Sequence, residues 1–276
     1  MVYRMVSVRG LDFQVRTGGP DDGAPVLLLH GFPQHSGMWD RISPALHAQG
    51  LRTFAPDQRG YSPATRSSDV DEFRMGNLVA DMVALLDALE LPQVDVVGHD
   101  WGSVVGWHLS ASHADRVRTF TALSVPHPDA VGRARHTAGS DQKQRSSYML
   151  LFATPGEAER TLLDNDAEGL WGIFNPLSRE ESKSYVEPLL APGALTAALN
   201  WYRRLERPNL GPALVPVTYV WGEEDYAMGP VAAAACAEFV APGLDYRFVP
   251  VPGISHWIVD EAPGLVADEI VARIGV

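Results

Sequence analysis

Asp100 stands in the segment VDVVGHDWGS, where Gly98 and Gly102 lie two residues before it and two residues after it. The apolar run before the aspartate is typical of a buried strand. Glycine is favoured at both places when a strand turns sharply into a helix, because this turn crowds its neighbours and presents the central side chain. The start of a helix also offers backbone N–H groups and a positive field that favour a carboxylate. The pattern indicates a nucleophile, although aspartate is also common there as an N-cap.

Three further reactive positions directly follow predicted strands. The turn HGFP at residues 30–33 places the backbone N–H of Phe32 where, with the N–H of Trp101, it can stabilise an oxyanion. Asp225 follows a strand pattern in VWGEED, and His256 follows another in GISHW. Taken singly, these features are more often a structural turn, a surface acid and a packing histidine. Taken together, they give the order nucleophile, acid, histidine at the ends of different strands, which indicates nucleophilic hydrolysis.

Alternating strand and helix patterns are expected to bring these groups to one edge of a sheet. MVSVRGLDFQVRTGG alternates apolar and polar residues on both sides of a turn and predicts an antiparallel hairpin. VLLLHGF is typical of a strand buried on both faces, and further strands are predicted for LRTFAPDQ, VDVVGHD and VRTFTALSVP. Helical patterns lie between them, roughly at residues 37–49, 75–90 and 101–112. This alternation predicts an α/β fold, with a mostly parallel sheet and helices on both faces.

The pattern changes between residues 128 and 210. There QRSSYMLLFATPGEAERTLL and LTAALNWYRRLE predict helices with no clear strand between them. The sheet pattern then resumes with PVTYVWGEED, GPVAAAACAEFV, YRFVPVPG and APGLVADEIVARI. We therefore expect a first core part at 1–127, a helical cap inserted at 128–210 and a second core part at 211–276. Such an insertion usually covers the carboxyl ends of the strands, where open α/β sheets bind ligands.

Composition excludes several classes of function. The 276 residues are 46% hydrophobic, which is enough for one sizeable core. The net charge is −12 and the basic residues form no cluster, so we expect no nucleic-acid partner. No run approaches the roughly 20 apolar residues of a membrane span, and MVYRMVSVRG lacks the apolar stretch of a signal peptide. The lone Cys236 cannot form an internal disulfide and is interpreted as a buried helix residue, so we expect a cytoplasmic protein.

The motifs resemble those of the α/β-hydrolases over the whole chain, and in particular those of the epoxide hydrolases. HGFP, GHDWG, the Gly-x-x-Asp of GEED and the late GISHW all match, but they also match haloalkane dehalogenases, which share an aspartate nucleophile. The cap separates the two groups. YMLLFATPGEAE begins at Tyr148 and NWYRRLER contains Tyr202, and both segments are similar to those that carry the two cap tyrosines of epoxide hydrolases. Tyr185 and Tyr226 lack such a context and are expected to be surface or packing residues.

The resemblance implies an eight-stranded α/β-hydrolase fold that converts an epoxide into a vicinal diol, without a metal or an organic cofactor. An aspartate side chain can attack the strained carbon unaided, because its ordinary pKa of about 3.9 leaves it ionised at neutral pH. Asp100 is the expected nucleophile, and Tyr148 and Tyr202 are expected to donate hydrogen bonds and a proton to the epoxide oxygen. His256, oriented by Asp225, is expected to activate the water that cleaves the resulting ester. The expected substrate-binding residues are Phe32, Trp101, Tyr148 and Tyr202, and the N–H groups of the first two form the expected oxyanion hole.

Two alternatives remain at this level. A haloalkane or haloacid dehalogenase would use the same aspartate, but Phe32 replaces the asparagine that commonly follows HG to bind halide, which leaves Trp101 as one donor. Fluoroacetate-type enzymes place arginines just after the nucleophile, whereas this chain has WGSVVGW. A binding protein that retains a hydrolase fold is the non-enzymatic alternative, and the intact set of five side chains argues against it. The expected partners are a small apolar epoxide and water, with no membrane insertion.

Overall fold

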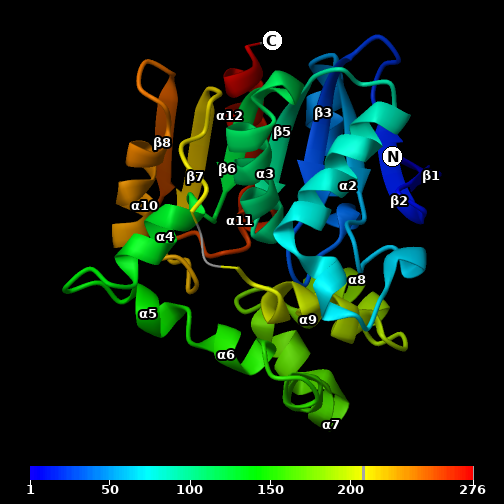
Figure 1. Cartoon of the computed structure of the whole chain (residues 1–276), viewed down its shortest axis with the longest axis vertical. Helices are drawn as coiled ribbons and strands as arrows, with labels where there is room; N and C mark the ends of the chain where they lie inside the picture. Colours follow the sequence, from blue (N-terminus) through cyan, green and yellow to red (C-terminus); the bar gives the residue numbers. More distant parts are fainter. Residues whose placement is uncertain (207–208, 276) are drawn as a thin grey trace.

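The computed structural model describes residues 1–206 and 209–275, and it contains an eight-stranded sheet (Figure 1). The strand order is β1-β2-β4-β3-β5-β6-β7-β8. β1 pairs with β2 as the predicted antiparallel hairpin, β2 is antiparallel to β4, and the other neighbouring strands are parallel. The prediction of a mostly parallel eight-stranded α/β-hydrolase sheet is therefore confirmed. The strands are β1 (Val2–Val8), β2 (Leu11–Gly18), β3 (Ala24–Leu29), β4 (Leu51–Pro56), β5 (Val94–His99), β6 (Val117–Leu123), β7 (Val217–Gly222) and β8 (Tyr246–Val251).

Helices cover both faces of the sheet, which explains the unbroken apolar runs of its central strands. α2 (Met75–Ala88) and α3 (Trp101–Ser112) pack on one face, while α1 (Ser43–Ala48) and α12 (Pro263–Ile274) pack on the other. All six residues of β5 and of β7 are buried as a result. The shorter elements of the core are η1 (Ser36–Arg41), η2 (Pro63–Thr65), η3 (Val70–Phe73), η4 (Ala114–Arg116), α10 (Pro230–Ala235), η5 (Cys236–Phe239) and α11 (Ile258–Glu261).

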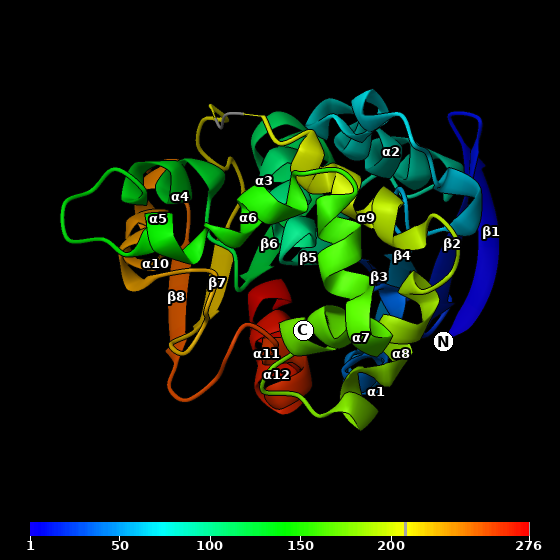
Figure 2. The same ribbon diagram turned by 90° about the horizontal axis from the view of Figure 1, so that it is seen from below.

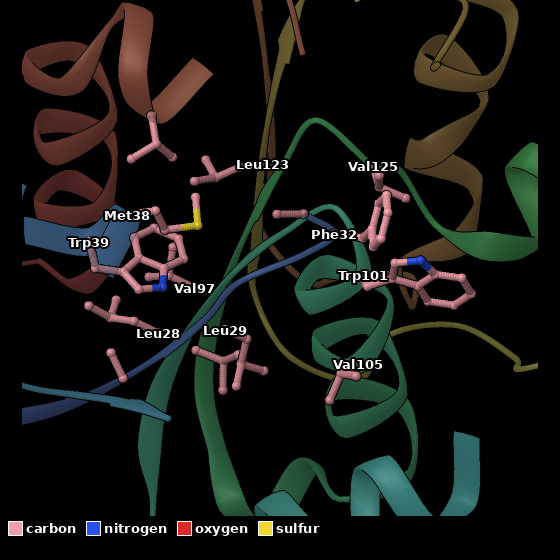
Figure 3. Close-up of a cluster of buried hydrophobic side chains, with 14 of the residues drawn as sticks. Leu28, Leu29, Phe32, Met38, Trp39, Val97, Trp101, Val105, Leu123 and Val125 are labelled. Carbon is pink, nitrogen blue, oxygen red and sulfur yellow. The ribbon is translucent and has the colours of Figure 1, made fainter. Parts of the chain in front are cut away.

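Side chains from both faces form the core around the central strands. Figure 3 shows Met38 and Trp39 on one side of these strands, and Phe32, Trp101 and Val125 gathered on the other side beside α3. Trp39 is fully buried, and complete burial of a large apolar side chain stabilises a fold by about 1.5–3 kcal/mol. Cys236 is buried as predicted, and this burial raises the pKa of its thiol to about 12. Within the described residues, no helix is long and apolar enough to cross a membrane.

The strand order creates a crevice where residues of the candidate site lie. β3 lies between β4 and β5, so the chain leaves β3 toward one edge of the sheet and later builds from β5 toward the other edge. Connections that diverge in this way open a crevice at the carboxyl ends of the two strands, where α/β folds bind ligands. Phe32 comes three residues after the end of β3, and Asp100 directly follows β5. Two motifs 68 residues apart in the sequence are thereby brought into contact.

In the part of the chain that the structure describes, six helical elements lie between β6 and β7, within the predicted insertion. They are α4 (Pro128–Ala134), α5 (Gln142–Arg145), α6 (Tyr148–Phe152), α7 (Glu157–Ile173), α8 (Arg179–Leu189) and α9 (Ala194–Arg203). Figures 1 and 2 show α6 to α9 lying across one end of the sheet, over the region where β3 and β5 lie. α4 instead packs against α10 and η5. Arg207, the last residue of NWYRRLER, and Pro208 lie outside the described residues.

Some predicted helices are divided in the structure. The pattern at residues 37–49 forms η1 and α1, because Pro44 supplies no N–H and begins a new helix. The pattern over QRSSYMLLFATPGEAERTLL forms α5, α6 and the start of α7. Pro155 and Gly156, the latter with φ +76°, end α6 and start α7. GPVAAAACAEFV likewise forms α10 and η5.

Candidate active site

Asp100 occupies a strained turn between β5 and α3. Its φ is +52° and its ψ is −121°, a conformation that costs a residue other than glycine about 1–3 kcal/mol. Asp100 occupies the N-cap position of α3, but its side chain makes no capping hydrogen bond to that helix. The Phe32 N–H instead donates a hydrogen bond of 2.7 Å to Asp100 Oδ1. The turn therefore aims the carboxylate across the crevice rather than at its own helix.

Close packing around the turn explains the two flanking glycines. A Cβ atom on Gly98 would lie 2.3 Å from the carbonyl oxygen of Gly102. A Cβ atom on Gly102 would lie 2.0 Å from the carbonyl oxygen of Leu29. Both contacts are with backbone, which cannot swing aside as a flexible side chain can. Any larger residue would have to displace the turn that holds the aspartate.

His256 lies between the two aspartates that the sequence singles out. Its Nδ1 is 3.0 Å from Asp225 Oδ2, and its Nε2 is 3.6 Å from Asp100 Oδ2. Asp225 follows β7 and is fully buried, and its Oδ1 accepts hydrogen bonds from the N–H groups of Ala227 and Met228. All three predicted side chains thus meet at the carboxyl ends of β5, β7 and β8.

The electrostatics of this group favour an ion pair. Burial opposes a charged imidazole, but the charge of Asp225, the close contact with Asp100 and the hydrogen bond to Asp225 outweigh this effect. Together they raise the pKa of His256 to about 10. Burial also opposes ionisation of Asp225, but His256 and the hydroxyl of Ser124 outweigh it, so the pKa of Asp225 is lowered. The histidine is therefore protonated at neutral pH, and Asp225 carries the negative charge that faces it.

His99 is a buried polar residue that the sequence analysis did not assign a role. Its Nε2 donates a hydrogen bond of 2.8 Å to the carbonyl oxygen of His256. Burial, and then the charge of His256, lower the pKa of His99 to about 4, so the ring is neutral. This bond ties the end of β5 to the loop that carries His256. Its place directly before Asp100 was the available signal, but its partner could not be read from the sequence.

Tyr148 and Tyr202 face the same space from two helices of the insertion, α6 and α9. Their ring centroids lie 6.3 Å apart, and the Tyr202 ring packs edge-on at 5.2 Å from Trp101 and 5.3 Å from Phe32. Burial, and then the charge of Asp100, raise the pKa of both phenols well above the ordinary value. Both hydroxyls therefore keep their protons and can donate hydrogen bonds.

Two cavities, of about 450 and 430 Å³, share Asp100, Tyr148 and Tyr202 in their walls. The first runs along α3 and α4 and includes Trp101. The second includes Phe32, Phe152, Tyr226 and His256. Each predicted substrate-binding residue thus lines at least one cavity. In the part of the chain that the structure describes, no group of three or more His, Cys, Asp or Glu side chains is arranged to hold a metal ion.

Tyr185 and Tyr226, both expected to be surface or packing residues, have different surroundings in the structure. Tyr185 is buried, and its hydroxyl donates to Asp260, in keeping with a packing role. Tyr226 instead lines the second cavity, with its ring centroid 5.3 Å from that of His256. Tyr226 is also 40% exposed, so the expectation of a surface residue is confirmed, but the sequence did not indicate that the loop after Asp225 turns this ring toward the histidine.

The fold, with Asp100, Asp225 and His256 at the carboxyl ends of its strands, is that of the α/β-hydrolases. The family model for the alpha/beta hydrolase fold matches residues 24–263. The chain is 32% identical to the AB hydrolase superfamily protein YfhM of Bacillus subtilis, over 95% of this chain and 94% of that protein. It is 31% identical to Epoxide hydrolase A of Mycobacterium tuberculosis, with the same coverage of 95% and 94%. A crystal structure of an epoxide hydrolase from Vigna radiata superposes with a TM-score of 0.83 at 29% identity, over 99% of this chain and 98% of that one. The chain belongs to the α/β-hydrolase family, in its epoxide hydrolase branch, and is a hydrolase.

Proposed function

We propose that this enzyme hydrolyses an epoxide to a vicinal diol through a covalent ester of Asp100. One observation carries the proposal: the two carboxylate oxygens of Asp100 have different neighbours. Oδ1 lies 2.7 Å from the Phe32 N–H, and Oδ2 lies 3.6 Å from His256 Nε2. A carboxylate placed between an oxyanion donor and a base can form an ester and then have that ester cleaved.

In the first step, an oxygen of Asp100 attacks one carbon of the epoxide, and the bond from that carbon to the epoxide oxygen breaks. The electron pair of this bond stays on oxygen as a developing alkoxide. Tyr148 and Tyr202 donate hydrogen bonds to this oxygen, and one of them gives it a proton. Their raised pKa values keep both phenols protonated until that moment. The products of the step are an alkyl ester and a free hydroxyl group on the neighbouring carbon.

Formation of the ester itself converts His256 into a base. The charge of Asp225 contributes most to the raised pKa of His256, and the contact with Asp100 and the charge of that residue contribute as well. The ester carries no charge, so this support is lost when Asp100 is alkylated, and the pKa of His256 falls. A proton passes from the imidazolium to the tyrosinate by way of water or the new hydroxyl, which restores the phenol. The neutral Nε2 is then ready to accept a proton from water.

In the second step, the water deprotonated by His256 attacks the carboxyl carbon of Asp100. The N–H groups of Phe32 and Trp101 receive the oxyanion, and one such donor contributes about 2.7–4 kcal/mol in a preorganised site. Asp225 stabilises the imidazolium that forms. Collapse of the intermediate breaks the bond between the carboxyl carbon and the alkyl oxygen. The departing oxygen takes the second proton of the added water, so the diol leaves and Asp100 returns as a carboxylate beside the imidazolium of His256. In this proposal the helices within 128–210 act as a cap that holds the two tyrosines opposite the nucleophile.

Dehalogenation with the same nucleophile is less well supported. A halide site needs two N–H donors beside the nucleophile, and Phe32 offers no side-chain donor. The indole of Trp201 packs 5.7 Å from that of Trp101, but its N–H already donates to the carbonyl oxygen of Arg59 at 2.9 Å. The two phenols opposite the nucleophile have a role in opening an epoxide and none in releasing a halide.

A single turnover in water enriched in ¹⁸O tests the mechanism. With enzyme in excess over styrene oxide, the ester mechanism places the label in the carboxylate of Asp100, and the first diol released carries none. Peptide mass spectrometry locates the label. If the label enters the diol alone, then water attacks the epoxide directly and the ester mechanism is wrong.

A further inference from the structure

Ser124 contacts both the acid and the histidine of the active site, although no catalytic motif includes it. It directly follows β6, and its side chain is fully buried. Its Oγ lies 2.6 Å from Asp225 Oδ2 and 2.8 Å from His256 Nδ1. This second distance is shorter than the 3.0 Å between His256 Nδ1 and the nearer oxygen of Asp225. The hydroxyl is therefore a full member of the hydrogen-bond network behind the imidazole.

The backbone holds Ser124 in an unusual conformation to make these contacts. Its φ is +67°, which favours glycine and is adopted by few other residues. The Ser124 N–H donates to the carbonyl oxygen of Val220 at 2.9 Å, and the Ser124 carbonyl accepts from the hydroxyl of Tyr219 at 2.8 Å. Both partners belong to β7, the strand that leads into Asp225. The serine is thus fixed to the same strand as the acid that it contacts.

Counting protons assigns a direction to each hydrogen bond. A hydroxyl has one proton to donate, and an ionised carboxylate only accepts. Ser124 must therefore donate to Asp225 Oδ2 and accept the proton on His256 Nδ1. Because Asp225 Oδ1 is already bonded to the N–H groups of Ala227 and Met228, the serine fixes the second oxygen of the same carboxylate. The Nδ1 proton of the histidine is then shared between the carboxylate and the serine oxygen.

We propose that Ser124 is a positioning residue for ester hydrolysis, which holds the Nδ1 proton of His256 jointly with Asp225 and keeps Nε2 directed at Asp100. This proposal rests on the ester mechanism proposed above. Attack on the epoxide needs a charged Asp100 and the two phenols, but no base. Cleavage of the ester does need the correctly oriented, neutral Nε2. Loss of the serine hydroxyl should therefore slow ester cleavage and leave ester formation nearly unchanged.

The test is rapid acid quenching followed by intact-mass spectrometry, with styrene oxide as the probe. Ser124→Gly removes the hydroxyl and accepts the positive φ. Ser124→Asn is the rescue variant, because asparagine tolerates this conformation and can both donate to a carboxylate and accept from an imidazole. Ser110→Ala is the matched control, since Ser110 is also a fully buried serine but donates only to the carbonyl of Gly106 within α3. Ser124→Cys, in which the thiol is similar in shape to the hydroxyl but hydrogen-bonds weakly, provides a second measurement of the decay rate if the glycine variant does not fold.

We expect ester formation in Ser124→Gly within about twofold of wild type, and ester decay at least about tenfold slower. kcat and KM should then fall together with kcat/KM little changed, and the pH at which decay is half-maximal should move. Ser124→Asn should recover most of the decay rate, and Ser110→Ala should match wild type. Decay of the glycine and cysteine variants at the wild-type rate overturns the proposal, as does an equal fall in formation and decay, because a merely structural role lowers both. Absence of any ester in wild type and in His256→Gln instead refutes the ester mechanism itself, and with it the role of Ser124.

Discussion

Replacing Tyr148 and Tyr202 by phenylalanine, singly and together, isolates the contribution of the two phenol hydroxyls. The rings are needed for packing, since Tyr202 contacts Phe152 at 5.1 Å and Trp101 at 5.2 Å, and phenylalanine keeps those contacts. The free energy of unfolding should therefore change by no more than about 1 kcal/mol per substitution, the usual net contribution of a hydroxyl. In the proposed mechanism each hydroxyl stabilises negative charge that develops only in the transition state, so the rate of ester formation should fall far more than the stability does.

Removing one preorganised donor from such a site costs about 2.7–4 kcal/mol, or a factor of about 10²–10³ in rate. Each single variant should therefore lose about 10²-fold in the rate of ester formation. In the double variant the rate of ester formation should fall at least about 10³-fold. This loss should be smaller than the product of the two single effects, because both hydroxyls donate to the same oxygen atom.

The assay is single-turnover ester formation from styrene oxide, followed by rapid quenching. Tyr246→Phe on β8 is the control, because it removes a phenol hydroxyl that does not line either cavity and should leave the rate unchanged. A double variant that forms the ester within tenfold of the wild-type rate would refute the assignment of the tyrosines. Release of halide from a haloalkane by that variant at an undiminished wild-type rate would favour dehalogenation.

Three further predictions concern stability, the turn and the substrate. The pKa of His256 is about 10 in the folded protein instead of the ordinary 6.5, so its contribution to stability is full below about pH 6.5 and is lost as the pH rises toward 10. Denaturant titrations of wild type should show the free energy of unfolding falling by up to about 1.4 kcal/mol per pH unit between these values. His256→Gln should lack this slope. Gly102→Ala places a Cβ 2.0 Å from the carbonyl oxygen of Leu29. The substitution should therefore destabilise the fold by roughly 1–3 kcal/mol and slow ester formation at least about tenfold. A variant with the stability and the rate of wild type would show that the turn is not closely packed. Because two cavities share Asp100, an epoxide substituted on both carbons should be accepted with one substituent in each cavity. A panel of substrates tests this prediction, and turnover of terminal epoxides alone would show that only one cavity is used.

Much of the sheet, and the residues that meet at the candidate site, could be predicted because each depends on local sequence. Runs such as VDVVGHD indicate strands buried on both faces, and α3 begins and ends where its pattern predicts. Asp100 stands out because a tight turn needs glycine on both sides of it. The helices of the insertion were predicted less well, since single residues such as Pro155 and Gly156 divide a continuous apolar pattern.

The residues that escaped prediction act through contacts set by topology. Ser124 meets Asp225 and His256 only because β6 lies between β5 and β7, and no local pattern around the serine indicates this order. His99 reaches a carbonyl 157 residues away. Tyr226 lines a cavity because of how its loop folds after Asp225, and spacing in the sequence does not describe that loop.

The covalent ester on Asp100 is the central claim, and intact-mass spectrometry of His256→Gln with styrene oxide tests it most directly. Without the base, ester formation should proceed and ester cleavage should not. We expect a stable increase in mass equal to one molecule of epoxide, located by peptide mapping on the segment that contains Asp100. An unmodified His256→Gln protein, under conditions in which the wild type converts the epoxide, would contradict it.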